Sequence, residues 1–187
     1  MGSKMNLLLC LGLFLMSLGV AVAKPVEMEG GNITFNAPDD FAPLTPDQIA
    51  KKFPQRNGPM DAVGNASGSV TICYQVTATD LQPGQLSEAQ QGIGGMLGRV
   101  VPGIQWVKND IVEINGTKWI YFEMTSAADQ GEIHNIEITT SYHGKMFVMN
   151  FNSAAEDFDK YQGELRKSLN SVKVKNSPAA PSPSTAN

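Results

Sequence analysis

The stretch that most resembles a chemical motif is rich in glycine. "QGIGGMLGRV", residues 91–100, carries glycine at positions 92, 94, 95 and 98. A phosphate-binding loop needs glycines at the turn before a helix, where free N–H groups point at the anion. The spacing fits neither the dinucleotide fingerprint nor the P-loop, and the first glycine follows the expected N-cap, Ser87, by five residues. We therefore predict no nucleotide site. The glycines should lie inside a helix that packs closely against another element.

A second candidate combines histidine with carboxylates. His134 lies near Glu132, and Glu123 falls on the neighbouring expected strand. The three could form a carboxylate–histidine pair or a metal site. However, His134 and Glu132 share their strand face with Ile136 and Ile138. Ordinary polar strand residues are therefore favoured over catalysis or metal binding.

The remaining reactive or aromatic residues also favour a structural interpretation. Cys73 lies in an apolar run and is expected to be a buried, inert thiol. No G-x-S-x-G nucleophile elbow occurs. Trp106, Trp119 and Tyr121 could line a ligand groove, although core aromatics are the favoured interpretation. We predict no catalytic residues, no cofactor and no metal.

Three helices are expected from their N-terminal signals. "TPDQ", "SEAQ" and "SAAE" each fit a capping box. In this motif the side chain of the first residue accepts from the backbone N–H of the fourth, and the side chain of the fourth accepts from the backbone N–H of the first. A helical apolar stripe follows the last of them. The expected helices are Pro46–Phe53, Glu88–Val100 and Ala154–Leu169.

The region between the last two helices shows strand periodicity. Asn115-Gly116, His143-Gly144 and "ADQGE" are turn signals that join four expected antiparallel strands. These strands are Gln105–Ile114, Thr117–Ser126, Glu132–Tyr142 and Lys145–Asn152, with further strands at Ser69–Thr79 and Asn32–Phe35.

Pairing across these turns assigns the apolar side chains to two faces, both of which should be covered. One face carries Val112, Trp119, Tyr121, Ile136, Ile138, Phe147, Met149 and Phe151. The other carries Ile111, Ile120, Phe122, Met124, Met146 and Val148.

Both ends of the 187-residue chain differ from its middle. Lys4, the apolar run Leu7–Val22 and a small-x-small ending at Ala23 predict a signal peptide over residues 1–23, with a retained anchor as the alternative. Residues 24–31 are expected to be an N-terminal extension, 32–174 a single domain, and 175–187 a disordered tail rich in Pro, Ser and Ala. The net charge of −4 argues against nucleic acid as a partner.

The order of these elements resembles a known family. "NITFNAPDDF", the hairpin in "GIQWVKNDIVEINGTKWIYFEM" and the ending "DFDKYQGELRKSLNSVKV" are similar to the PsbP-like and DcrB-like superfamily of bacterial secreted proteins. The resemblance implies an α+β fold, an antiparallel β-sheet meander with helices packed on its faces, that is, an α/β/α sandwich. It also implies a binding or accessory module, because the family brings no active site to transfer.

We therefore expect a non-enzymatic accessory protein, periplasmic or extracellular, that binds another envelope or secreted protein, as an adaptor or immunity protein does. No stable membrane insertion is expected after signal cleavage. Arg56, Met60 and Asp61, in the proline- and glycine-containing segment 52–68, are the predicted partner-binding residues. The alternative is a small-molecule-binding or weakly hydrolytic protein that uses the groove at Trp106, Trp119 and Tyr121.

Overall fold

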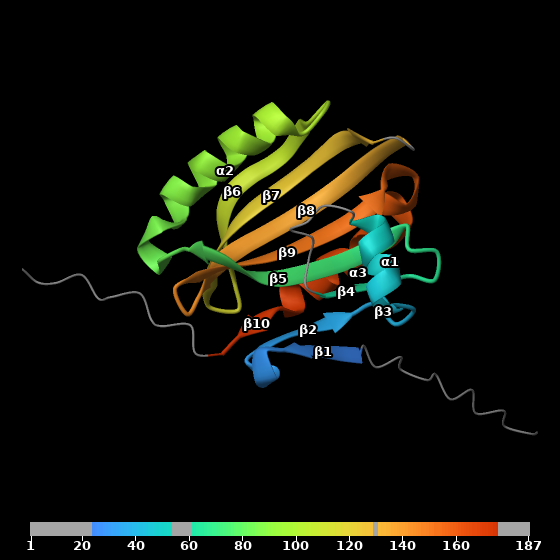
Figure 1. Ribbon diagram of the computed structural model, residues 1–187, viewed down its shortest axis with the longest axis horizontal. Coiled ribbons are helices and arrows are strands. Elements are labelled where there is room, and N and C mark those ends of the chain that lie inside the picture. The colour runs from blue at the N-terminus through green and yellow to red at the C-terminus, as the bar shows by residue number, and fades with distance from the viewer. Residues whose placement is uncertain (1–23, 54–60, 129–130, 176–187) are drawn as a thin grey trace, which may run out of the picture.

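A computed structural model describes residues 24–53, 61–128 and 131–175. The described residues form a seven-stranded sheet, a three-stranded sheet and three α-helices (Figure 1). The large sheet has the strand order β3-β4-β5-β9-β8-β7-β6, and the small sheet has the order β1-β2-β10. The strands are β1 (Lys24–Met28), β2 (Ile33–Ala37), β3 (Ala42–Pro43), β4 (Asp61–Gly64), β5 (Val70–Asp80), β6 (Gln105–Ile114), β7 (Thr117–Ala128), β8 (Gly131–Tyr142), β9 (Lys145–Ala154) and β10 (Lys173–Val174). The helices are α1 (Pro46–Lys52), α2 (Leu86–Val100) and α3 (Ala155–Ser171).

The four-strand meander β6–β9 confirms the expected strands and the turns at Asn115-Gly116 and His143-Gly144, whereas residues 129–130 of the third predicted turn lie outside the described residues. Asn115 and Gly116 both have positive φ, as do His143 and Gly144, which is the geometry of tight hairpin turns. The register places Val112 opposite Trp119. Local turn chemistry and alternating apolar residues are therefore sufficient to define this part of the sheet.

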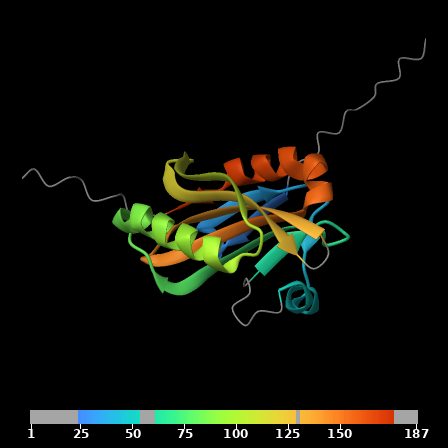
Figure 2. The same ribbon diagram turned by 90° about the horizontal axis from the view of Figure 1, so that it is seen from above.

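The larger core lies between the sheet and α3. The apolar stripe of α3 packs on β8, β9 and β2, and the small sheet covers the rest of this face. Figure 2 shows α3 and α2 on opposite sides of the large sheet. The predicted composition of this face is confirmed, since all its members belong to one cluster: Val112, Trp119, Tyr121, Ile136, Ile138, Phe147, Met149 and Phe151.

The second core is smaller, because α2 packs on only part of its face. It contacts β6 and β7, and buries Leu86 together with Ile120, Phe122 and Met124. Val148, which was expected in this core, instead lines a cavity among polar side chains. The prediction that both faces of the sheet are covered is therefore confirmed for the whole face under α3. On the other face it is confirmed for the β6–β7 half, which lies under α2.

Only one of the three predicted capping boxes forms. Thr45 Oγ1 accepts from Gln48 N at 3.3 Å, and Gln48 Oε1 accepts from Thr45 N at 2.8 Å. The boxes at Ser87 and Ser153 are wrong. A 3-10 turn, Pro83–Gln85, leads directly into α2, whose first residue is already Leu86. Ser153 belongs to β9, and its Oγ donates to the Ala154 carbonyl at 2.8 Å.

The residues expected to be an extension before the domain are part of the fold. Residues 24–28 form β1, which pairs with β2, and a 3-10 turn over Glu29–Gly31 connects the two strands. β10 pairs with the other side of β2. Strands of two to five residues carry too little periodicity to be recognised without their partners.

No helix within the described ranges is both long and apolar enough to cross a membrane.

Close packing of the α2 glycines is confirmed at Gly94. A Cβ atom added there would lie 3.1 Å from Asn109 Nδ2 and 3.5 Å from Phe122 Cε1. Added Cβ atoms at Gly92 and Gly98 would meet nothing within 4 Å. These two glycines therefore weaken the helix, and no close contact with the described part of the chain requires them.

We predict that Gly92→Ala and Gly98→Ala each raise the free energy of unfolding by about 0.5–1 kcal/mol, because alanine removes the conformational entropy that glycine loses in a helix. Thermal unfolding should show a rise of roughly 1–4 °C for each variant. Gly94→Ala is the matched comparison, since its Cβ must displace Asn109 and should cancel the gain. Equal gains at all three positions would contradict the close approach at Gly94.

Candidate functional site

The predicted partner-binding residues are only partly within the described chain. Arg56 and Met60 lie outside the described residues. Asp61 is the exposed first residue of β4 and pairs with Tyr74. The assignment of these three residues to partner binding stays a prediction.

The three aromatic residues of the predicted groove are not brought together. Trp119 is 0% exposed and Tyr121 is buried, both in the core beneath α3. Trp106 is 39% exposed and packs against Phe122, beneath α2, with ring centroids 5.6 Å apart. A bulge in β6 separates Trp106 from the regular pairing that follows. The bulge reverses the alternation of side chains along β6, so Trp106, which has the same parity as Val112, lies on the opposite face of the sheet from Trp119 and Tyr121.

His134 and Glu123 do meet, on adjacent strands of the α3 face. His134 Nε2 lies 2.9 Å from Glu123 Oε1. Tyr121 donates its hydroxyl to Glu123 Oε2 at 2.7 Å, and Arg166 Nη2 donates to Oε1 at 2.7 Å. Glu132, the third residue of the predicted set, is exposed at the start of β8, opposite Ala127. Sequence reasoning missed Arg166, which approaches from α3.

This cluster, Glu123–His134–Arg166–Tyr121, holds a charged carboxylate in a fixed position. Burial opposes ionisation of Glu123, but hydrogen bonds from His134, Arg166 and Tyr121 outweigh it and lower the pKa to about 2. An ionised carboxylate can only accept, so His134 Nε2 carries the proton of the shared bond.

The cluster ties α3 to the sheet. The His134 ring stacks on Phe158 of α3, with centroids 3.5 Å apart and planes 10° from parallel. With both oxygens of Glu123 occupied by donors, the arrangement resembles a structural ion pair more than an acid–base site.

A different polar surface lies on the α2 side of the central strands. α2 runs along the β6 side of the sheet, away from β5 (Figure 1). Beyond the part of the sheet that α2 covers, β8, β9 and β5 present a row of side chains dominated by carboxamides. Asn152 donates to Asn135 Oδ1 at 2.7 Å. We call the hollow above this row the polar cavity. It measures about 300 Å³ and is lined by Phe53, Cys73, Tyr74, Gln75, Asn135, Glu137, Val148, Asn150 and Asn152.

Three titratable groups of the polar cavity, Glu137, Cys73 and Tyr74, have raised pKa values. Burial raises the pKa of Glu137 to about 7, although a hydrogen bond from Asn150 opposes this shift. Burial raises the pKa of Cys73 to about 12, so its thiol is protonated and unreactive at neutral pH. The cavity can therefore offer hydrogen bonds to a polar ligand, and its thiol is unsuited to nucleophilic attack.

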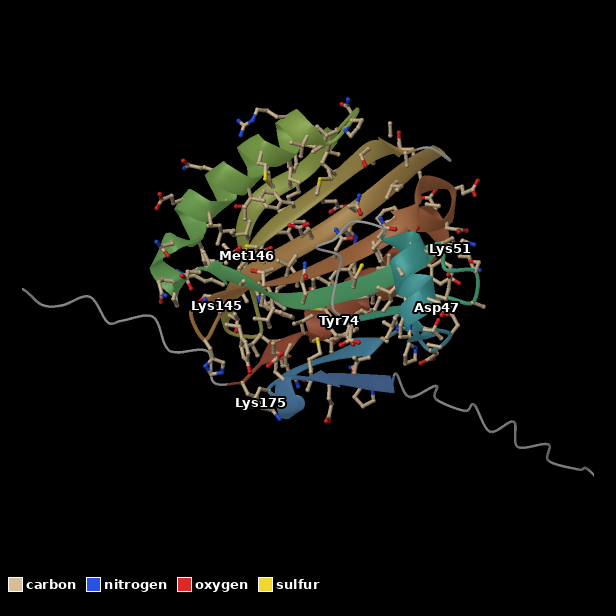
Figure 3. All side chains as sticks on the ribbon, in the orientation of Figure 1. Asp47, Lys51, Tyr74, Lys145, Met146 and Lys175 are labelled. Atoms are coloured by element: carbon tan, nitrogen blue, oxygen red, sulfur yellow. The ribbon has the colours of Figure 1, made fainter. Side chains whose placement is uncertain are left out.

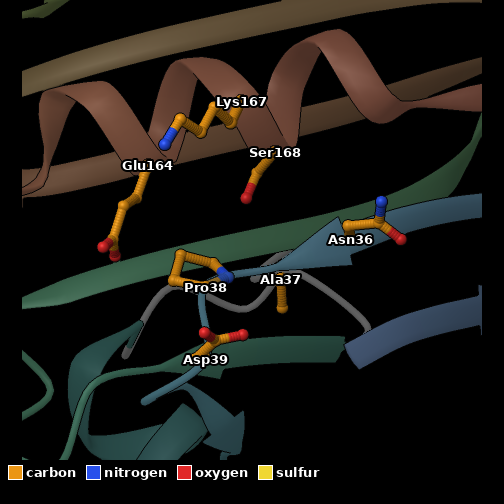
Figure 4. Close-up of a pocket in the computed structure, with 7 residues that line it drawn as sticks. All are labelled: Asn36, Ala37, Pro38, Asp39, Glu164, Lys167 and Ser168. Carbon is orange, nitrogen blue, oxygen red and sulfur yellow. The ribbon is translucent and has the colours of Figure 1, made fainter. Parts of the chain in front are cut away.

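Two cavities larger than the polar cavity lie elsewhere among the described residues, and a smaller one, about 210 Å³, is lined by Glu27, Glu29 and Asp61 beside β5. Figure 4 shows one of about 340 Å³ between α3 and the end of β2, where Asp39 and Glu164 face a single lysine, Lys167. The other, about 570 Å³, lies beside α1, whose Asp47 and Lys51 are labelled in Figure 3. In neither do charges of one sign converge. Within the described chain, no group of three or more His, Cys, Asp or Glu residues is placed to hold a metal ion.

Exposed apolar side chains gather where α2 turns into β6. Met96 is 46% exposed, Val100 64%, Trp106 39% and Val107 59%. These are the large apolar side chains that are exposed within residues 24–53, 61–128 and 131–175, and all lie between Met96 and Val107. We call this set the corner patch. Apolar surface concentrated at one place on a sheet edge is typical of protein contacts.

The structure thus defines a class of protein: a small α/β/α sandwich with a polar cavity and an apolar corner patch. No protein-family model matches the chain, and the comparison with curated proteins found no match either.

Solved structures are similar in fold. The cyanobacterial PsbP (CyanoP) from Synechocystis sp. PCC 6803 aligns with a TM-score of 0.57 at 10% identity, over 84% of this chain and 95% of that one. LpqN of Mycobacterium tuberculosis, described as involved in cell envelope biogenesis, aligns with a TM-score of 0.57 at 14% identity, over 82% and 91%. A structure from Bacteroides thetaiotaomicron gives 0.53 at 10% identity, over 83% and 49%. The chain has a PsbP-like fold, as the sequence resemblance implied.

Proposed function

We propose that this chain is a non-enzymatic accessory protein, acting in the bacterial envelope or outside the cell, which binds another protein through its corner patch. The observation that carries the proposal is the gathering of Met96, Val100, Trp106 and Val107 at one corner, while apolar side chains elsewhere in the described structure are largely buried.

Three further features support this function. The leader-like N-terminal sequence is typical of an exported protein. LpqN, which is similar in fold, is described as involved in cell envelope biogenesis. The most concentrated group of titratable side chains, around Glu123, is occupied by structural hydrogen bonds. A binding role uses the exposed surface and needs none of these groups to react.

The corner patch is suited to a protein partner rather than to a small ligand. Val100 ends α2 and Val107 lies at the bulge of β6, and none of the cavities described above is lined by a residue of the patch. Side chains on such a surface bury enough area only against another extended surface.

We expect that Met96→Lys combined with Val100→Lys reduces capture of the partner at least tenfold, because a charge placed in an apolar contact must be desolvated on binding. The tagged mature chain would be incubated with envelope and secreted fractions of the producing cells, and the captured proteins quantified by mass spectrometry. Both side chains are exposed, so thermal unfolding should stay within about 0.5 kcal/mol of wild type.

Ser87→Lys combined with Gln91→Lys is the matched control. It adds the same charge to exposed positions of the same helix, away from its C-terminal end. A third bait, with Arg56, Met60 and Asp61 all changed to alanine, tests the alternative face. Loss of capture in that bait alone would place the partner on segment 52–68, and the corner patch would be excluded.

A further inference from the structure

The exposed edge of β6 carries information beyond the corner patch. β6 spans Gln105–Ile114 and ends the large sheet, whereas β3, at the opposite end, has only two residues. Residues 105–110 are all exposed. A long, open edge strand is a template for pairing with another strand unless its side chains restrict that pairing.

One contact identifies the backbone groups that point outward. Ile111 N–H donates to the side-chain Oδ1 of Asp110 at 2.8 Å, so this N–H is turned away from β7. Backbone direction alternates along a strand. Asn109, Ile111 and Glu113 therefore present their N–H and C=O groups at the open edge, while residues 110, 112 and 114 are bonded to β7.

The side chains of the edge select one partner. In an antiparallel strand pair related by a two-fold axis, the residue on the axis faces its own copy. The residue one position before it faces the residue one position after it in the other copy, and the same holds for each further step outward. An axis at Asp110 or at Lys108 opposes identical charges. An axis at Ile111 or Val112 places Lys108 and Asp110 opposite uncharged residues of the other copy. An axis at Asn109 places Lys108 of each copy opposite Asp110 of the other, which gives two cross-strand ion pairs.

We infer that the β6 edge pairs with the β6 edge of a second copy of this chain, antiparallel and centred on Asn109. Lys108 and Asp110 lie on the same face of the strand, since Lys108 Nζ is 5.0 Å from the Tyr121 ring centroid and Asp110 follows at alternate spacing. On pairing, Ile111 N–H gains a backbone carbonyl, and the Asp110 carboxylate is released to Lys108 of the second copy.

α2 approaches β6 closely at one of its glycines. Gly94 lies directly against Asn109, and Gly98, one helical turn further on, has open space around it.

This pairing involves Val107 of the corner patch but not Met96 and Val100, which lie on α2 and whose replacement tests the proposed capture of another protein. The two failures can therefore be distinguished. A monomeric chain that still captures its partner through Met96 and Val100 contradicts only the inference about the second copy.

The test is a charge exchange measured by sedimentation velocity on the mature chain, loaded at about 5–500 μM, where small interfaces associate. Wild type should show a concentration-dependent dimer. Lys108→Glu and Asp110→Lys each oppose like charges twice and should raise the dissociation constant about tenfold. The double variant restores two ion pairs and should return to within about threefold of wild type.

Asn109→Pro provides a second, charge-independent measurement. Proline removes an outward N–H while the bonds of residues 110 and 112 to β7 are retained, so this variant should be folded by circular dichroism and monomeric. A single monomeric species of wild type at the highest concentration would overturn the inference. So would a dimer that is indifferent to the single reversals, or a double variant that is as weak as either of them.

Discussion

Replacing Glu123 with glutamine should lower the free energy of unfolding by about 2–3 kcal/mol at pH 7. The carboxylate is buried and accepts from His134, Tyr121 and Arg166. Its pKa of about 2, compared with 4.5 for an ordinary glutamate, converts to about 3 kcal/mol, which we reduce because the Arg166 side chain is partly exposed. The melting temperature should fall by roughly 5–10 °C.

The pH dependence identifies the cause of this loss. A carboxyl group whose pKa is lowered on folding contributes stability that is fully present above its unfolded pKa, and this stability is lost as the pH falls toward its folded pKa. For Glu123 the window runs from about pH 4.5 down to about pH 2. Urea unfolding of wild type should therefore weaken through this window, and Glu123→Gln should weaken less.

Glu132→Gln is the control for Glu123→Gln. It removes the same charge from the exposed end of the neighbouring strand, and it should stay within about 0.5 kcal/mol of wild type. If Glu123→Gln unfolds like this control at pH 7, the cluster does not anchor α3 as its geometry indicates.

Replacing Glu137 with glutamine should have the opposite effect, a gain of about 1–3 kcal/mol at pH 8. Burial in the polar cavity raises the pKa of Glu137 to about 7, so at pH 8 the folded protein holds a charge that its surroundings disfavour. Glutamine has nearly the same shape, has no charge, and can still hydrogen-bond with Asn150.

The sign follows from linkage. When folding raises the pKa of a carboxyl group, the group does not reduce the free energy of unfolding at any pH below its unfolded pKa. The free energy of unfolding then falls as the pH rises from the unfolded pKa through the folded pKa. For Glu137 this loss extends from about pH 4.5 to about pH 7, a window above that of Glu123. Wild type should therefore be more stable at pH 5 than at pH 8, and Glu137→Gln should remove much of that difference.

The measurement is urea unfolding at pH 5, 6, 7 and 8, with Glu113→Gln as the matched control on exposed β6. Equal stability of wild type and Glu137→Gln at pH 8 would show that the carboxylate is well solvated, and the raised pKa would be wrong. A carboxyl group that costs stability at neutral pH is characteristic of functional sites. The polar cavity is therefore the part of the sheet at which a small polar ligand is best sought.

The parts of the fold that depend on neighbours along the chain can be predicted from the residues alone. Alternating apolar residues and the Asn115-Gly116 and His143-Gly144 turns define the meander and its two faces. The apolar stripe of α3 identifies a helix that packs on that meander. Such patterns are readable because turns and amphipathic periods involve residues only a few positions apart.

The contacts between these elements became evident only in three dimensions. Arg166 reaches Glu123 from a helix 43 positions away in sequence, and no local pattern marks that meeting. The same is true of the opposite placement of Trp106 and Trp119, and of strands β1 and β10, which are too short to be recognised until β2 lies between them. The partial cover by α2 likewise leaves polar side chains over β8, β9 and β5. Contacts between distant segments depend on how whole elements pack, and periodicity along one element carries no information about the partner it will meet.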